Sequence, residues 1–168
     1  MELLYRQAAA GEIDIALVML KEAAEAIRQK GLDQWSIWLN PGEDQVKWIH
    51  DGFANGEFYF VENESGRSVG MFRLSEEDIL YWGVQENKAG YIHSLVVRKE
   101  FAGQELGQVM MKYVEKYLLT KGINLLRLDC NAANKWLCAY YENAGFVKVG
   151  QKQMPHALNN LYEKQLRS

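Results

Sequence analysis

The chain has 168 residues, 48% of them hydrophobic and 24% charged, and its formal net charge is −3 at neutral pH. This length gives one domain a sizeable core and is too short for two ordinary domains, so we expect a single domain over residues 1–168. The acidic balance argues against a nucleic-acid partner, and no apolar run approaches the roughly 20 residues of a membrane helix, so a soluble, cytoplasmic protein is expected.

The N-terminal third is expected to hold a short strand and two helices. Leu3 to Ala8 suggests the strand, and an apolar face between Glu12 and Lys30 predicts a helix that Gly31 ends. The segment from Leu32 to Pro41 has no clear period, so we expect a loop there, followed by a helix over Glu43 to Phe53. Three tryptophans lie in this region: Trp35, Trp38 and Trp48.

The middle of the chain is expected to be mostly β-structure. Glu57 to Val61 and Val69 to Leu74 are typical of a hairpin, because the turn sequence Asn63-Glu64-Ser65-Gly66 separates them. A further strand is expected to include Leu80 to Trp82. Tyr91 to Val97 is strongly apolar, which predicts a strand buried on both faces of a sheet.

The last third alternates between helices and strands. We expect a strand at Leu125 to Leu128, a short helix at Asn134 to Asn143, and strands at Phe146 to Gln153 and Asn160 to Leu166. The helix before them carries one apolar stripe, formed by Leu106, Val109, Met110, Tyr113, Val114, Tyr117 and Leu118.

These elements predict an α/β (α+β) fold with a central mixed sheet of six to seven strands flanked by about four helices. The early strands follow one another through short turns, so they are expected to be antiparallel. The later strands are linked through helices, as parallel neighbours must be.

A glycine-bearing turn precedes the long helix. Its sequence is Phe101-Ala102-Gly103-Gln104-Glu105-Leu106-Gly107, with the two glycines four residues apart. A helix N-terminus leaves backbone N–H groups without partners and carries about half a positive charge, so such a turn suits a phosphate. The alternative is that the glycines serve only a tight turn and a close packing contact.

The order of features around this turn resembles the GNAT superfamily of acyl-CoA-dependent N-acyltransferases. The order is strand, turn, long helix, strand, then Asn134 and, seven residues later, Tyr141 before Gly145 and Phe146. The resemblance is close over about residues 90 to 150. It implies an enzyme that transfers an acetyl group from acetyl-CoA to a primary amine of a small molecule or peptide.

In that family the turn usually reads Arg/Gln-x-x-Gly-x-Gly/Ala, and its backbone amides hold the pyrophosphate of coenzyme A. Gly107 fits the last position, but Ala102 replaces the basic or amide residue and Glu105 stands where the first glycine is expected. An acidic residue in a first helical turn is also explained by the helix dipole alone. The resemblance implies cofactor contacts from Leu95, Val96, Val97, Ala102, Gly103, Gln104, Glu105, Leu106, Gly107, Gln108, Asn134 and Tyr141.

The resemblance also implies roles in catalysis. Tyr141 matches the tyrosine that gives a proton to the departing sulfur, with a packing role as the alternative and Tyr140 as the expected core residue. The strand is expected to diverge from its neighbour near Leu95 to Val97, so that a backbone N–H polarises the thioester carbonyl. His93 is the candidate base, although a histidine in an apolar strand also serves as scaffold. Asn134 is in addition a good helix N-cap.

Substrate recognition is expected from aromatic residues near Trp35 and Tyr81. Aromatic faces beside Asp33, Glu43 and Asp44 would hold an ammonium through cation–π and charge attraction, in keeping with the acidic balance. The alternative is that the tryptophans fill the core or a homodimer contact. Cys130 and Cys138 lack the spacing of a metal site, and we expect both to be small hydrophobic residues with no disulfide.

Two other functions compete with an acetyltransferase. A dinucleotide-binding unit would share the glycine turn and an acidic residue, Asp129, at 22 residues past Gly107, but its motif needs three glycines. A non-catalytic sensor or scaffold of the same fold, which binds coenzyme A or a protein partner, is favoured by the altered turn at Ala102 and Glu105.

Overall fold

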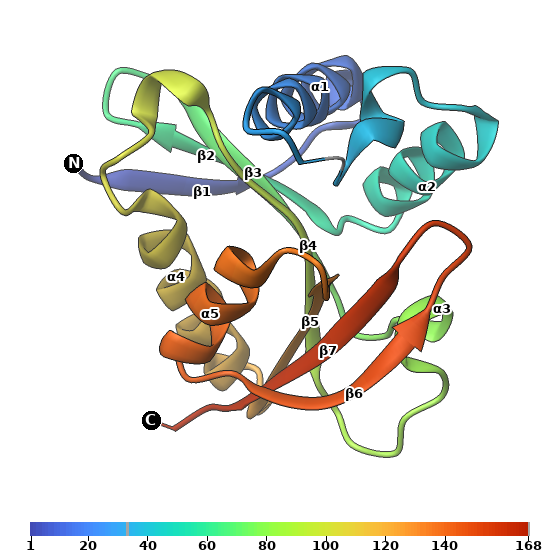
Figure 1. Ribbon diagram of the computed structural model, residues 1–168. Coiled ribbons are helices and arrows are strands. Elements are labelled where there is room, and N and C mark those ends of the chain that lie inside the picture. Colours follow the sequence, from blue (N-terminus) through green and yellow to red (C-terminus); the bar gives the residue numbers. More distant parts are fainter. Residues whose placement is uncertain (33, 168) are drawn as a thin grey trace. The chain divides into compact units, whose positions relative to one another are not determined.

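The computed structural model describes residues 1–32 and 34–167 and divides into two compact units (Figure 1). The first unit comprises residues 1–74 and 93–109, and the second comprises residues 75–92 and 110–168. Seven strands and five α-helices occur among the described residues, and the strands form a mixed sheet. The predicted α/β class and the predicted mixed sheet are therefore confirmed.

An antiparallel β-meander forms the sheet of the first unit. The partner of Tyr5 in β1 is Val61 in β2, and the partner of Val61 in β3 is Gly70. At the β2–β3 turn, the Asn63 side chain accepts hydrogen bonds from the N–H groups of Ser65 and Arg67, which explains the predicted hairpin. The elements of this unit are β1 (Leu3–Gln7), α1 (Ile13–Gln29), α2 (Glu43–Ala54), β2 (Phe58–Asn63) and β3 (Ser68–Ser75), with 3₁₀ turns η1 (Ala10–Glu12) and η2 (Ser36–Leu39).

Aromatic and aliphatic side chains from α1, α2 and the sheet fill the core of the first unit. Met19, Leu20 and Ile49 are fully buried and pack in one cluster with Phe58 and Phe60. The three N-terminal tryptophans lie half-buried at the edge of this cluster: Trp35, Trp38 and Trp48. A core role for the tryptophans, the alternative to substrate contact, is thus confirmed in part.

The second unit contains a parallel strand pair and an antiparallel hairpin. Strand β4 pairs with β5 in parallel through Gly90 with Leu126 and Tyr91 with Arg127. Strand β7 pairs antiparallel with β5 and with β6. The elements wholly in this unit are α3 (Ile79–Trp82), β5 (Leu125–Asn131), α5 (Lys135–Asn143), β6 (Val147–Gln153) and β7 (Leu158–Gln165). Strand β4 (Gly90–Val97) and helix α4 (Leu106–Thr120) have residues in both units, and the 3₁₀ turn η3 (Lys99–Phe101) before α4 belongs to the first.

The expectation that the later strands are parallel is correct for β4 and β5 and wrong for the last two strands. Helix α5 does connect β5 to β6, but β5 pairs with β7, so the chain returns as a hairpin. The residues of β6 are exposed along almost the whole strand, and Gly150 is half-buried. An edge strand of this kind carries no signal in sequence that distinguishes its pairing partner.

The expected strand at Leu80 to Trp82 is also wrong, because Ile79–Trp82 form the short helix α3. The Asp78 side chain accepts a hydrogen bond from the Tyr81 N–H at 3.2 Å, and the Trp82 N–H donates to the Asp78 carbonyl at 2.8 Å. This N-cap outweighs the strand preference of the aromatic residues.

The predicted apolar stripe of α4 is buried along most of its length. Leu106, Met110, Val114 and Leu118 recur at every fourth position and are buried, as the sequence predicts. Val109 is 47% exposed, so it lies outside the buried stripe. Tyr113 and Tyr117 are half-buried and stack on each other with ring centroids 6.3 Å apart.

Candidate functional site

The turn before α4 is open to solvent. Ala102, Gly103, Gln104 and Glu105 are exposed, and a Cβ atom added to Gly103 would have no heavy atom within 4 Å. Helix α4 begins at Leu106, and the Val109 N–H donates to the Glu105 carbonyl at 3.3 Å in its first turn. The predicted anion-binding turn therefore lies at the start of a helix of 15 residues, as the sequence requires.

Two residues of this turn have left-handed backbones. Gly103 has φ of 80°, which glycine adopts without strain, and Glu105 has φ of 57°. A residue with a Cβ pays about 1–2 kcal/mol in this region. The family pattern has a glycine at position 105, and glycine would adopt this left-handed backbone without strain. This sequence has a glutamate there instead.

The first N–H groups of α4 are the donors that a phosphate would use. The N–H groups of Leu106, Gly107 and Gln108 precede the first intrahelical donor, Val109, so helix geometry gives them no acceptor within α4. Leu106 is buried through its side chain, whereas Gln108 is exposed. These donors belong to the backbone, so the substitutions at Ala102 and Glu105 leave them in place.

Nearby cations differ in their availability to an anion. Arg98 donates to Glu22 of α1 at 2.8 Å and 3.3 Å, so its guanidinium is engaged within the first unit. Lys99 is exposed and no ion pair is recorded for it among the described residues. Of the two residues considered as replacements for the missing cation at Ala102, Lys99 is the one without a competing carboxylate.

Strand β4 changes character in its second half. Gly90, Tyr91 and Ile92 are buried, whereas His93, Ser94 and Leu95 are half-buried. Ser94 has φ of 53°, which is unusual for a residue inside a strand and marks a local irregularity of the backbone. The prediction of burial on both faces is therefore correct only for the start of β4.

The three residues expected to contact a ligand through main chain follow this irregularity. Val96 is buried in the core cluster of the first unit beside Met71, while Leu95 and Val97 are half-buried. The Arg98 N–H donates to the Val69 carbonyl of β3 at 2.8 Å, so β4 remains tied to β3 at its end. The predicted divergence of β4 near Leu95 to Val97 remains a prediction.

His93 packs against a tryptophan of α2. Its ring lies edge-on to Trp48, with centroids 5.9 Å apart. Trp48 in turn stacks under the guanidinium of Arg73, whose carbon lies 4.2 Å from the indole centroid. Arg73 is buried and donates to Glu57 and to the Trp48 carbonyl, so the histidine rests on a rigid aromatic and ionic support.

Trp35, the predicted substrate contact in the first unit, has a strained backbone. Its φ is 67°, in the left-handed region that bulky residues rarely adopt. The Trp38 N–H donates to its carbonyl at 2.9 Å, and the indole is half-buried against the core cluster. Backbone strain of this kind often accompanies a functional position. Asp33, expected to assist Trp35, lies outside the described residues.

Asn134 is the N-cap of α5, as predicted. Its side-chain oxygen accepts from the Leu137 N–H at 3.1 Å, and its carbonyl accepts from the Cys138 N–H at 3.0 Å. Asn131 forms the turn before it by accepting from the Ala133 N–H at 2.9 Å. The cap is compatible with a contact between Asn134 and a cofactor, and that contact stays a prediction.

Tyr141 lies at the centre of an aromatic cluster in the second unit. Its ring is half-buried and approaches Phe146 and Tyr162, with centroid distances of 5.8 Å and 6.3 Å. Its hydroxyl has no hydrogen-bond partner among the described residues. Burial, and then the neighbouring Cys130 thiol, raises the pKa of Tyr141, so the hydroxyl stays protonated at neutral pH.

Tyr140 is the neighbour of Tyr141 on α5, and the two rings meet edge-on with centroids 5.4 Å apart. The ring of Tyr140 also stacks on Trp136, which is 73% exposed, with centroids 5.6 Å apart. Because Tyr140 and Tyr141 are both half-buried, the expectation that Tyr140 is the core residue of the pair stays a prediction.

Tyr81, the predicted substrate contact of the second unit, is half-buried on α3. Burial raises the pKa of Tyr81 to about 12, and the carboxylates of Asp129 and Asp78 add to the shift. Asp129 also raises the pKa of Tyr141, so one carboxylate acts on both tyrosines. The two predicted residues of the second unit that bear hydroxyls therefore share an electrostatic environment.

Sequence reasoning missed the side chains that support Tyr141. The hydroxyl of Tyr162 donates to Glu142 at 2.7 Å, which ties β7 to the residue after Tyr141. Asp129 accepts from Asn159 at 2.7 Å. Such pairs join residues 20 and 30 positions apart in the chain, and only the β5–β7 pairing could have predicted them.

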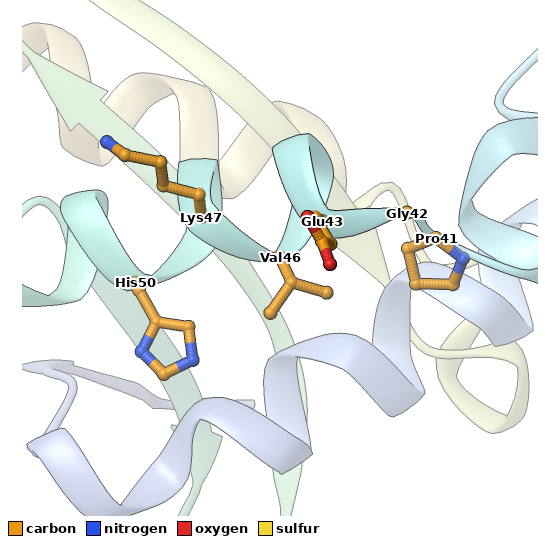
Figure 2. Close-up of a pocket in the computed structure, with 6 residues that line it drawn as sticks. All are labelled: Pro41, Gly42, Glu43, Val46, Lys47 and His50. Carbon is orange, nitrogen blue, oxygen red and sulfur yellow. The ribbon is translucent and has the colours of Figure 1, made fainter.

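The described residues also form a surface cavity of about 490 Å³ on α2 (Figure 2). Val46 and His50 point to one side of the helix in this view, and Lys47 points to the other. Lys47 pairs with Asp51 at 2.7 Å. One of the carboxylates expected to attract an ammonium, Glu43, belongs to its lining, which is Pro41, Gly42, Glu43, Val46, Lys47 and His50.

Comparison with known proteins gives one family. The model of the acetyltransferase (GNAT) family matches residues 19–146. An uncharacterized N-acetyltransferase of Bacillus subtilis (strain 168), YesJ, is 31% identical over 155 residues, which cover 88% of this chain and 82% of the relative. No described helix meets the length and apolarity that membrane crossing demands.

Solved structures agree with this family. A GNAT-family acetyltransferase from Listeria monocytogenes 4b F2365 is 27% identical and superposes with a TM-score of 0.81, over 99% of this chain and 96% of its own. The PaiA N-acetyltransferase from Thermoplasma acidophilum, solved in complex with coenzyme A, has a TM-score of 0.62 over 98% and 99% of the two chains. At 15% identity this second likeness shows the fold alone.

Proposed function

Since the chain belongs to the GNAT family of N-acetyltransferases, we propose that it transfers an acetyl group from acetyl-CoA to a primary amine of a small molecule or peptide. The observation that carries this proposal is Tyr141, a tyrosine with a raised pKa and a hydroxyl that no described residue engages. Its position, seven residues after the N-cap Asn134, matches the proton donor of the family.

The turn before α4 fits the pyrophosphate of coenzyme A. The exposed loop from Ala102 to Glu105 leaves room for a bulky anion, and the space beside Gly103 is empty of heavy atoms. We assign the N–H groups of Leu106, Gly107 and Gln108 as donors, with the helix dipole adding favourable charge. Lys99, three residues before Ala102 in the chain, would supply a cation.

The backbone after the irregularity at Ser94 would hold the rest of the cofactor. Acetyl-CoA supplies a thioester whose carbonyl carbon accepts the amine and whose sulfur then departs. Leu95 and Val97 offer their main-chain groups to the pantetheine arm, and a main-chain N–H there stabilises negative charge on the carbonyl oxygen. Val96 anchors this segment through its buried side chain.

Proton transfer is divided between two residues. Tyr141 presents an O–H donor to the charge that develops on the departing sulfur, and its raised pKa keeps that donor protonated. A thiol with a pKa near 8.5 is already a tolerable leaving group, so Tyr141 accelerates the reaction without being indispensable. His93 would accept the proton that the attacking amine must lose, held in orientation by Trp48.

We further propose that both units belong to one catalytic domain of residues 1–168 that acts in the cytoplasm. Tyr81 and Trp35 would recognise the acceptor amine. Tyr81 has carboxylates close enough to raise its pKa, which suits a cationic acceptor. Trp35 offers an aromatic face on a strained backbone.

A sensor that binds coenzyme A without catalysis is the second candidate. The observation that favours it is Glu105, which places a strained, negatively charged residue in the turn that would receive the pyrophosphate. At about 6 Å, this carboxylate would cost about 3 kcal/mol at an effective dielectric of 20 and under 1 kcal/mol in water. Because Glu105 is exposed, the smaller figure applies, and the turn keeps the coenzyme A binding that both candidates require.

Two measurements test the proposal in sequence. Isothermal titration calorimetry with acetyl-CoA and with coenzyme A should give binding, and absence of binding at millimolar ligand would reject the enzyme and the sensor of coenzyme A alike. Release of free thiol from acetyl-CoA is then measured with a panel of amines. Binding without release for any amine would favour the sensor.

A further inference from the structure

Two thiols face each other beside Tyr141. Cys130 on β5 and Cys138 on α5 are both buried, and their sulfur atoms lie 3.6 Å apart. Neither cysteine is part of a disulfide. The sequence predicts two small hydrophobic residues, and the strand–turn–helix connection through Asn134 brings them into contact.

We propose that Cys130 and Cys138 form a reversible disulfide that slows acetyl transfer by displacing α5. A disulfide bond is about 2.05 Å long, so the two sulfur atoms must approach by about 1.5 Å. Side-chain rotation supplies part of this approach, and the proposal assigns the rest to a shift of one of the two backbones.

Helix α5 is the element that moves. Strand β5 pairs with β7 over all seven of its residues, including Cys130 with Asn160, and with β4 at Leu126 and Arg127, so it is held in place. Helix α5 has only nine residues, and much of its surface is exposed, including Lys135, Trp136 and Ala139. A short helix with an exposed face shifts at a lower free-energy cost than a strand in the middle of a ladder.

Movement of α5 reaches Tyr141 directly. Cys138 and Tyr141 are three residues apart on the helix and therefore lie on neighbouring positions of one face. A misplacement of about 1 Å in a catalytic group can slow a reaction by about 10²-fold. The effect on turnover rests on the proposed role of Tyr141, whereas formation of the disulfide does not.

The surroundings of the two thiols differ. The Asn160 side-chain N–H donates to the Cys138 sulfur at 3.5 Å, and the Cys138 S–H donates to the Asn131 carbonyl at 3.7 Å. Burial, together with the adjacent Cys138, raises the pKa of Cys130, so that sulfur stays protonated at neutral pH. We therefore assign the first attack to Cys138 and the resolving step to Cys130.

The oxidant is a low-molecular-weight disulfide, R–S–S–R. The Cys138 thiolate attacks one sulfur of R–S–S–R, which breaks that bond and releases R–S⁻, and R–S⁻ takes up the proton that Cys138 lost. The Cys130 sulfur then attacks the mixed disulfide at Cys138, loses its own proton, and releases the second R–SH. The protein loses two hydrogen atoms, and one disulfide becomes two thiols.

The test exposes the folded, full-length protein to excess oxidised glutathione. We expect intact mass to fall by two hydrogen atoms, peptide mapping to find Cys130 joined to Cys138, and turnover to fall at least about tenfold. Dithiothreitol should restore both mass and turnover. Hydrogen exchange of the backbone amides of residues 136–144 should differ between the two forms.

Matched variants separate the disulfide from other oxidative damage. Cys138→Ala should keep the turnover of the reduced protein and lose its sensitivity to oxidised glutathione, and Cys130→Ala serves in its place if Cys138→Ala does not fold. Equal inhibition of the variant, a stable glutathione adduct, or a disulfide that leaves turnover unchanged would each overturn the proposal. If the reduced protein shows no turnover with any amine, the proposed function fails independently of the disulfide. In that case, unchanged hydrogen exchange of the α5 amides on oxidation would overturn the proposed displacement of α5.

Discussion

The turn before α4 and the surroundings of Tyr141 use different parts of the chain for the proposed chemistry. The turn is exposed and offers backbone N–H groups, so its side chains depart from the family pattern without removing a donor. Tyr141 acts through its own side chain, which Phe146 and Tyr162 hold in place. A site built from backbone tolerates substitution, whereas a site built from one hydroxyl does not.

The largest expected effect comes from removing the hydroxyl of Tyr141. Tyr141→Phe removes one hydroxyl and keeps the ring in its cluster, so turnover should fall by about 10²- to 10⁴-fold while the affinity for acetyl-CoA stays near that of the wild type. Steady-state thiol release and calorimetry measure the two quantities. Tyr140→Phe is the matched control, because its ring faces Trp136, and it should leave turnover within about twofold. Equal losses in both variants would remove Tyr141 from the mechanism.

An intermediate effect is expected from Glu105, in the turn that offers backbone N–H groups. Glu105→Gly removes the strain of a left-handed backbone, worth about 1–2 kcal/mol, and gives back about 0.4–1 kcal/mol through a more flexible unfolded chain. The free energy of unfolding should therefore rise by up to about 1.6 kcal/mol. Loss of the exposed carboxylate should also tighten coenzyme A binding by about threefold, from a repulsion near 0.7 kcal/mol in water at about 6 Å.

Glu105→Gln separates charge from strain in the same turn. It removes the carboxylate but keeps a Cβ atom in the left-handed region, so coenzyme A should bind about threefold more tightly with no gain in stability. Urea denaturation of the two variants and the wild type measures the effect of backbone strain on stability, and calorimetry measures the effect of charge on coenzyme A affinity. Unchanged affinity in both variants would place the carboxylate away from the pyrophosphate.

The smallest effect at neutral pH tests whether the turn is independent of a distant part of its own unit. Arg6 donates to both carboxylate oxygens of Glu12, which lowers the pKa of Glu12 to about 2 from its ordinary value of 4.5. Because the folded-state pKa is lowered, this stability is complete above about pH 4.5 and is lost as the pH falls toward 2. Glu12→Gln should flatten the dependence of unfolding free energy on pH in this window.

The same variant should leave coenzyme A affinity unchanged at pH 7, since Glu12 contacts β1 and η1 and not the turn. Glu25→Gln, at an exposed position of α1, is the control and should alter neither the pH dependence nor the affinity. A loss of affinity in Glu12→Gln alone would show that the turn depends on remote packing.

The sequence alone determined the family, the order of the elements and the identity of the main candidates. Periodicity located α1, α2, α4 and α5 to within about two residues, because each has a clear apolar face or cap. Asn134 and Tyr141 were recognisable because their order and spacing are local properties of the chain. The glycine turn was recognisable for the same reason, and the sequence itself shows that Ala102 and Glu105 depart from the family pattern.

Only the tertiary structure decided the backbone conformation and the long-range contacts of these residues. The left-handed backbone of Glu105, the helix at Ile79–Trp82, the return of β7 to β5, and the contact between Cys130 and Cys138 all depend on groups that the chain brings together by folding. Periodicity reports which face of an element is apolar, but it does not report φ angles or long-range partners. The backbone conformation of the turn and the neighbours of Tyr141 are therefore properties of the fold, and they define what the proposed experiments measure.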